Sequence, residues 1–172
     1  MSLPRVMLGG VEIVVHAGVP EQADAPVVAE TIIRMGQGGG VKLTHFRKAG
    51  GTISGQGWMP PGLDGLDYSQ PLELRLTKQE SITQASHLGI TLTSTPRPDM
   101  APWAQALVGR DWVPTPMSLS GLAATVVPLP GAKMYSVQWM PRYWVFAQRP
   151  VQQMNPGDPS RPHSWSIPWE EV

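Results

Sequence analysis

Apolar and polar residues alternate along several short stretches of the chain, a pattern typical of β-strands that bury one face. The clearest example is the stretch 71–77, in which every second residue is leucine, and the stretch 88–92 repeats the alternation. One short helical turn is expected, at residues 103–108. The pattern therefore predicts a predominantly β chain.

Glycines divide the first apolar runs of the sequence. The pair Gly9-Gly10 interrupts the stretch 5–16, and the cluster 36–40 interrupts the stretch 27–47. Because glycine readily takes the positive φ angles of a tight hairpin turn, each interruption predicts a β-hairpin. In the second hairpin, the strand after the cluster is expected to place three residues on one face: Val41, Leu43 and His45.

The end of the sequence forms a further alternating stretch, with Trp165, Ile167 and Trp169 on one side. Leaving the tryptophans in water would forfeit roughly a few kcal/mol of burial each. We therefore expect these three residues to be buried and to close a β-barrel or sandwich begun near the N-terminus. Residues 122–148, with a turn at Pro130-Gly131, are expected to form a compact three-stranded meander.

Proline and glycine account for 19 and 18 of the 172 residues. Long helices are disfavoured because proline removes a backbone donor and glycine loosens the backbone, whereas short strands with tight turns fit this composition. The length suits one domain with an insertion. The expected fold is all-β: a split β-barrel or β-sandwich of residues 1–94 and 151–172, with a small β meander inserted at residues 95–150.

The 13 basic and 13 acidic side chains cancel. Without net positive charge the chain has no long-range attraction to nucleic acid or anionic lipid, so neither is expected as a partner. The absence of cysteine excludes disulfides and thiolate metal sites. No stretch approaches the length of a membrane span, and no signal peptide is recognisable, so the protein is expected in the cytoplasm until it is assembled.

The residue types that carry out catalysis do not form a recognisable motif. His16, His45, His87 and His163 lack the spacing of a zinc enzyme, and the glycine cluster 36–40 lacks the lysine and hydroxyl residue of a phosphate loop. There is no Gly-x-Ser-x-Gly sequence to present a nucleophile. We expect no catalytic, metal-binding or cofactor-binding residues, and we expect that the chain is not an enzyme.

Asp64 and Asp67 lie three residues apart in the glycine-rich loop 62–68. Two carboxylates fall short of the about six to eight oxygen ligands that calcium takes. We expect them instead to accept backbone N–H bonds within the loop.

Trp139, Tyr143 and Trp144 form an aromatic cluster in the sequence. Flat apolar rings stack on sugars, so these residues are a candidate ligand platform. The alternative is that they pack in a core or against a neighbouring subunit. Seven tryptophans against two phenylalanines favour the core or the interface.

Two segments resemble structural proteins of siphophage tails. The first is ISGQGWMPPGLDGLDY at residues 53–68 with PLELR at 71–75, and the second is SWSIPWEEV at 164–172. In distal tail and minor tail proteins, a closing strand of tryptophan, alternating apolar residues and an acidic pair completes an N-terminal split barrel. The resemblance thus implies the same role for Trp165, Ile167 and Trp169.

The resemblance also implies a function, that of a non-enzymatic structural component of the virion. The chain is expected to be a ring-forming distal or minor tail protein that joins the tail tube to the tail tip, present in the host cytoplasm before assembly. The expected ring is a homo-hexamer with the tube, the tape measure and the tip hub as partners. The alternative is a carbohydrate-binding β module at the tail tip, built on Trp139, Tyr143 and Trp144.

Overall fold

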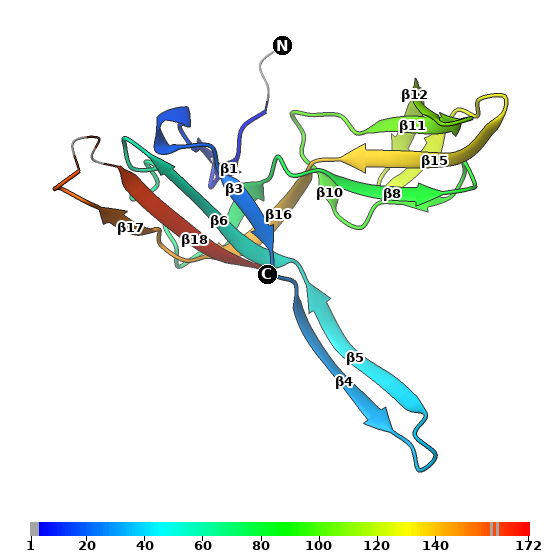
Figure 1. The fold of residues 1–172 in the computed structure, drawn as a ribbon, viewed down its shortest axis with the longest axis horizontal. Coiled ribbons are helices and arrows are strands. Elements are labelled where there is room, and N and C mark those ends of the chain that lie inside the picture. The colour runs from blue at the N-terminus through cyan, green and yellow to red at the C-terminus, as the bar shows by residue number, and fades with distance from the viewer. Residues whose placement is uncertain (1–3, 159, 161) are drawn as a thin grey trace. The chain divides into compact units, whose positions relative to one another are not determined.

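The computed structural model describes residues 4–158, 160 and 162–172. In these residues the regular elements are β-strands and one short 3-10 helix, η1 (Val15–Ala17) (Figure 1). The strands form several antiparallel sheets, and none of the described sheets closes into a barrel. The all-β fold class is confirmed, and the form it takes is sandwich-like.

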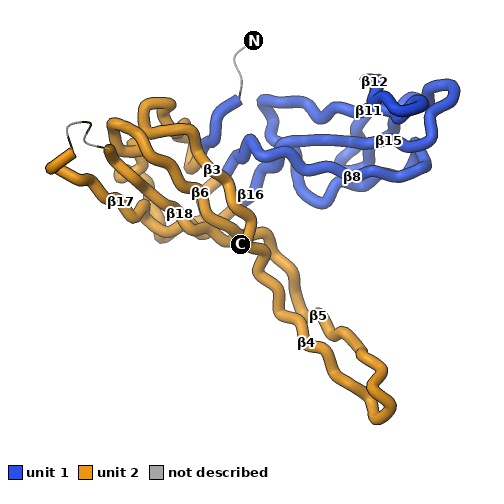
Figure 2. Tube along the Cα trace, viewed as in Figure 1, with its two compact units in different colours: residues 1–7, 74–143 blue, residues 8–73, 144–172 orange. Residues whose placement is uncertain are grey.

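The chain folds as two compact units (Figure 2). Unit 1 consists of Leu74–Tyr143 with the N-terminal residues up to Met7, and unit 2 consists of Leu8–Glu73 and Trp144–Val172. An insertion was expected over residues 95–150, and residues 95–143 of this range lie in unit 1. Residues 80–84 pair with residues 135–139, so unit 1 also includes a segment before residue 95.

Unit 1 is built from two antiparallel sheets. The first has the order β12-β11-β15-β8, and the second has the order β13-β14-β9. Their bounds are β8 (Glu80–Gln84), β9 (Ile90–Thr91), β11 (Trp103–Val108), β12 (Asp111–Thr115), β13 (Met117–Ser120), β14 (Ala123–Val126) and β15 (Ala132–Trp139).

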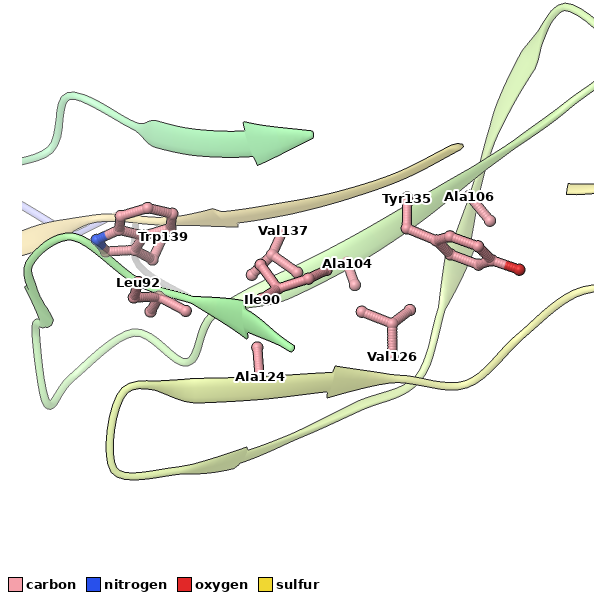
Figure 3. Packing of buried hydrophobic residues seen from close by; sticks show 9 residues of the cluster. All are labelled: Ile90, Leu92, Ala104, Ala106, Ala124, Val126, Tyr135, Val137 and Trp139. Atoms are coloured by element: carbon pink, nitrogen blue, oxygen red, sulfur yellow. The ribbon is translucent and has the colours of Figure 1, made fainter. Parts of the chain in front are cut away.

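The core of unit 1 draws its residues from both of these sheets (Figure 3). Tyr135, Val137 and Trp139 of β15 alternate with less apolar neighbours, as a half-buried strand requires. The cluster also contains Ile90, Leu92, Ala104, Ala106, Ala124 and Val126.

The expected helical turn at residues 103–108 is wrong, because this segment is strand β11. Ala104 and Ala106 are buried on one face, and β11 pairs with β12 on one side and β15 on the other. Alanine favours helices in isolation, but tertiary pairing overrides that preference here.

The expected meander at residues 122–148 is also wrong. The segment does form three strands, but they belong to three different sheets. β14 pairs with β13 and β9, β15 pairs with β11 and β8, and β16 (Pro141–Ala147) pairs with β18 (His163–Glu171). Short apolar runs predict that strands exist, but they do not specify the partner strands.

The largest sheet has the order β2-β1-β7-β16-β18-β6-β3, with β10 on β16 and β17 on β18. Its other bounds are β1 (Met7–Leu8), β2 (Val11–Glu12), β3 (Glu21–Asp24), β6 (Gly50–Gly57), β7 (Leu72–Arg75), β10 (Thr95–Pro96) and β17 (Val151–Met154). Within unit 2, the final strand β18 lies between β6 and β17 and pairs with β6 along most of its length.

Both predicted hairpins are confirmed. Gly9 and Gly10 join β1 to β2 with φ angles of 57° and 83°, which only glycine adopts without strain. The second hairpin consists of β4 (Val27–Arg34) and β5 (Gly40–Lys48), which form a two-stranded sheet of their own.

Candidate functional site

The hairpin β4–β5 has one apolar face and one charged face. Directly opposite residues of an antiparallel pair project to the same face. Thr31 pairs with Leu43, and Ile33 pairs with Val41, so these four side chains share a face. The alternate pairs, which include Ile32 with Lys42, project to the other face.

A β-bulge extends the apolar face. The register shifts between Ala29 and Glu30, so that Ala29 lies opposite Phe46, and Glu30 lies opposite Thr44. His45 is the extra residue on β5. Val41 and Leu43 share a face as predicted, and the register shift at His45 brings Phe46 onto the same face.

The apolar face is open to solvent along much of its length. Ile33, Val41, Leu43 and Phe46 remain 47%, 43%, 42% and 47% exposed. An isolated two-stranded hairpin is marginally stable in water, and contiguous exposed apolar surface marks interaction sites. We call the side chains of Val27, Ala29, Thr31, Ile33, Val41, Leu43 and Phe46 the hairpin apolar face; Lys48, opposite Val27, lies at its end.

The opposite face of the hairpin carries three basic residues and one acidic residue beside the apolar residues Val28 and Ile32. Lys42 Nζ lies 2.6 Å from Glu30 Oε2, and both side chains are partly exposed. Arg34 and Arg47 share this face. An exposed ion pair contributes little to stability, so the charges serve mainly to keep this face in water.

A second apolar surface of unit 2 lies on β16. Val145 is fully buried, whereas its neighbours Trp144 and Phe146 project outward and are 55% and 50% exposed. Phe146 lies opposite Glu170 of β18, which is also exposed. This aromatic surface therefore carries an acidic group at its edge.

The three residues expected to close the sheet are buried in unit 2. Trp165, Ile167 and Trp169 are 3%, 0% and 6% exposed. The Nε1 of Trp165 donates a 2.7 Å hydrogen bond to the carbonyl oxygen of Ala17 in η1. Ile167 lies opposite Ile53 of β6, which is equally buried. They occupy a strand inside an open sheet, so they complete a sheet and not a barrel.

The aromatic cluster does not form a shared platform. Trp139 is 1% exposed, and its Nε1 donates a 2.8 Å hydrogen bond to Ser94 Oγ in the core of unit 1. The hydroxyl of Tyr143 donates to Glu80 Oε1. A platform that uses the ring of Trp139 is thus excluded by burial. Trp144 remains exposed, as an interface residue would be in a free subunit.

The two loop aspartates have different partners. Asp67 accepts hydrogen bonds from the Ser69 hydroxyl at 2.6 Å and from the Ser69 backbone N–H at 3.0 Å, and these bonds lower its pKa below the usual 3.8. It is the local acceptor that was expected. Asp64 instead receives contacts at 3.4 Å from the side chains of Arg149 and Gln152. Its partners lie far away in the sequence.

Two of the histidines pack against aromatic rings. His16 packs edge-on against Trp58 at 5.1 Å between ring centroids, and His87 packs against Tyr135 at 5.8 Å. Within residues 4–158, 160 and 162–172, no three His, Asp or Glu side chains gather as metal ligands would.

The buried cation Arg97 was not anticipated from the sequence. Its side chain is fully buried in unit 1, where it donates to the carbonyl oxygens of Leu76 at 3.0 Å and Arg5 at 2.9 Å and forms a two-fold pair with Asp99 at 2.7 Å. These hydrogen bonds from Arg97 hold the pKa of Asp99 below 3.8. The Pro96-Arg97-Pro98-Asp99 sequence reads as a loop, which gave no sign of burial.

The comparisons with known proteins do not indicate a function, so the functional argument rests on the fold and its surfaces. No protein-family model matches the chain, and no curated protein matches it. In the part of the chain that the structure describes, no helix is long and apolar enough to cross a membrane.

Proposed function

We propose that this chain is a non-enzymatic structural subunit of a bacteriophage tail, a ring-forming distal or minor tail protein that joins the tail tube to the tail tip. The observation that carries the proposal is the hairpin apolar face, which stays exposed in the single chain. A second copy of the chain covers this face in the ring.

A closed ring requires two different surfaces on each subunit, one for each neighbour. Unit 2 offers two: the hairpin apolar face, and the aromatic surface of Trp144 and Phe146. Their charges are complementary, because Lys48 lies opposite Val27 on the same side as the hairpin apolar face, whereas the aromatic surface is bordered by Glu170. In the proposal, the hairpin of one subunit packs on β16 of the next.

The resemblance of residues 53–68 and 164–172 to siphophage tail proteins supplies the virion context of the proposal. On this basis the ring is a hexamer, with the tube, the tape measure and the tip hub as its other partners. The protein passes from the host cytoplasm into the tail on assembly. The genes on either side should accordingly encode other tail components.

Light scattering and negative-stain imaging of the purified chain test the proposal. We expect a mass several times that of one chain, and ring-shaped particles. Phe46→Asp and Ile33→Asp place a charge on the hairpin apolar face and should give folded monomers. Ile32→Asp is the matched control, since Ile32 is 64% exposed on the opposite face, and it should retain the ring. A monomeric parent protein would overturn the proposal.

A further inference from the structure

One face of the four-stranded sheet in unit 1 mixes uncharged polar residues with apolar ones. Ala104, Ala106 and Val137 point into the core, so the alternate residues of β11 and β15 project outward. The strands β12 and β8 extend this outer face. Its residues include no charged side chain: Ser81, Thr83, Trp103, Gln105, Leu107, Trp112, Pro114, Met134, Ser136 and Gln138.

A groove of about 500 Å³ opens at one end of this face. Its size is within the usual range for small-ligand sites, roughly 300–1,000 Å³. Its lining includes Trp103 and Gln105 of β11, with Pro114, Pro116 and Met117 opposite them. The groove therefore combines an aromatic ring and an amide with proline rings, and Ala104 and Thr115 also contribute to its lining.

A chain of hydrogen bonds fixes the polar groups beside the groove. Trp103 Nε1 donates to Gln138 Oε1 at 3.0 Å, and Gln138 Nε2 donates to Gln105 Oε1 at 3.2 Å. Because an indole nitrogen only donates, it determines the orientation of both amides. The Oε1 of Gln105 therefore accepts the bond from Gln138, and both N–H groups of Gln105 Nε2 can donate to a ligand.

The same bonds define the groups that a ligand meets. Proline-rich peptides also dock in aromatic-lined grooves, but here the indole N–H of Trp103 is already bound to Gln138, so the donors left for a ligand are those of Gln105. The ring face of Trp103 and the amide of Gln105 remain. A flat apolar surface beside amide donors, with no charge, matches a sugar ring with equatorial hydroxyls.

We propose that this groove binds a neutral saccharide, with a β-linked hexopyranose stacked on Trp103 and one hydroxyl accepting a hydrogen bond from Gln105. The groove lies within unit 1, whereas the hairpin apolar face lies in unit 2. The saccharide site is thus independent of ring formation. It uses Trp103, whereas the platform considered from the sequence used Trp139.

Titration calorimetry of the full chain with cellotetraose and with chitotetraose tests the site. Their β-1,4-linked rings have all-equatorial substituents and no charge. We expect at least one to bind with a dissociation constant below about 1 mM. Decaproline is the competing probe and should not bind. Binding of decaproline, or of neither saccharide at millimolar concentration, would overturn the proposal.

Three variants locate the site. Gln105→Ala should weaken binding about tenfold, the effect of one lost hydrogen bond, and should leave the fold intact because Gln105 lies on the outer face. Trp103→Ala should abolish binding. Trp112→Ala is the control, since Trp112 is exposed on the same face but outside the groove. Saccharide binding that survives both groove variants contradicts the assignment. The oligomeric mass should be the same for all three variants.

Discussion

Trp165 of the final strand lies directly opposite Gly55 of β6, and its indole covers the position that a Cβ on Gly55 would occupy. Such a Cβ would come within 2.6 Å of Trp165 Cζ2. A large ring thus fills the space above a cross-strand glycine, an arrangement known to fix strand register.

The first prediction concerns this pair. Gly55→Ala should destabilise unit 2 by about 1–3 kcal/mol, because the added methyl group displaces a buried indole. Gly65→Ala is the control, since nothing lies within 4 Å of its added Cβ. Thermal unfolding gives the melting temperatures of both variants. Equal melting temperatures would show that Trp165 does not rest on Gly55.

The second prediction concerns the tryptophans of unit 2. Trp165→Ala and Trp169→Ala should each cost roughly 3–5 kcal/mol, as expected for large buried aromatic residues. Trp144→Ala should leave the subunit folded, because Trp144 is 55% exposed. Melting curves decide the matter. If the first two variants melt like the parent while Trp144→Ala unfolds, the core of unit 2 is assigned incorrectly.

The third prediction concerns pH and the Arg97–Asp99 pair. The pKa of Asp99 lies below its unfolded value of 3.8, chiefly because Arg97 donates hydrogen bonds to it. Ionised Asp99 therefore stabilises the native state above about pH 3.8, and this contribution is lost as the pH falls through the native pKa. Asp99→Asn should melt at a lower temperature than the parent at pH 6. The difference should shrink below pH 3.8, and a constant difference would contradict the assignment.

The fourth prediction rests on the bulge in the hairpin and on the proposed ring. Deleting His45 removes only the extra residue, so Ala29 and Phe46 stay opposite each other, and the ring should survive. Deleting Thr31 shifts Arg34 into the place of Ile33 opposite Val41, which puts a charge on the apolar face and should yield monomers. Light scattering compares the oligomeric masses of the two deletion variants. Loss of the ring in the His45 deletion alone would mean that the bulge, and not the apolar face, is needed for assembly.

The sequence predicted the features that local chemistry determines. Gly9-Gly10 marked a turn because glycine tolerates its φ angles, and the alternation at residues 165–169 identified a buried face. The partner of each strand was not predictable in this way. Residues 103–108 formed a strand because β12 and β15 flank them, and the extra residue His45 reversed the alternation expected after Leu43. Register and pairing depend on distant segments that the local pattern does not reveal.

The same dependence on distant segments explains why Arg97 and the saccharide groove were missed. Arg97 is buried because backbone carbonyls at residues 5 and 76 converge on it. Trp103 and Gln105 acquire a role only when Gln138 of β15 lies beside them. No spacing within the sequence signals either arrangement.

The pairing of the final strand also imposes an order on synthesis. Glu171 accepts a hydrogen bond from the backbone N–H of Ala49, which precedes it by 122 residues. At about 5–20 residues per second, β6 waits on the order of ten seconds on the ribosome before β18 emerges. All of unit 1 is synthesised before β18 emerges, so unit 1 is able to fold first. A nascent chain that stops before Trp165 keeps the glycine-rich strand β6 paired with β3 but without β18, so premature termination yields a product that cannot complete unit 2.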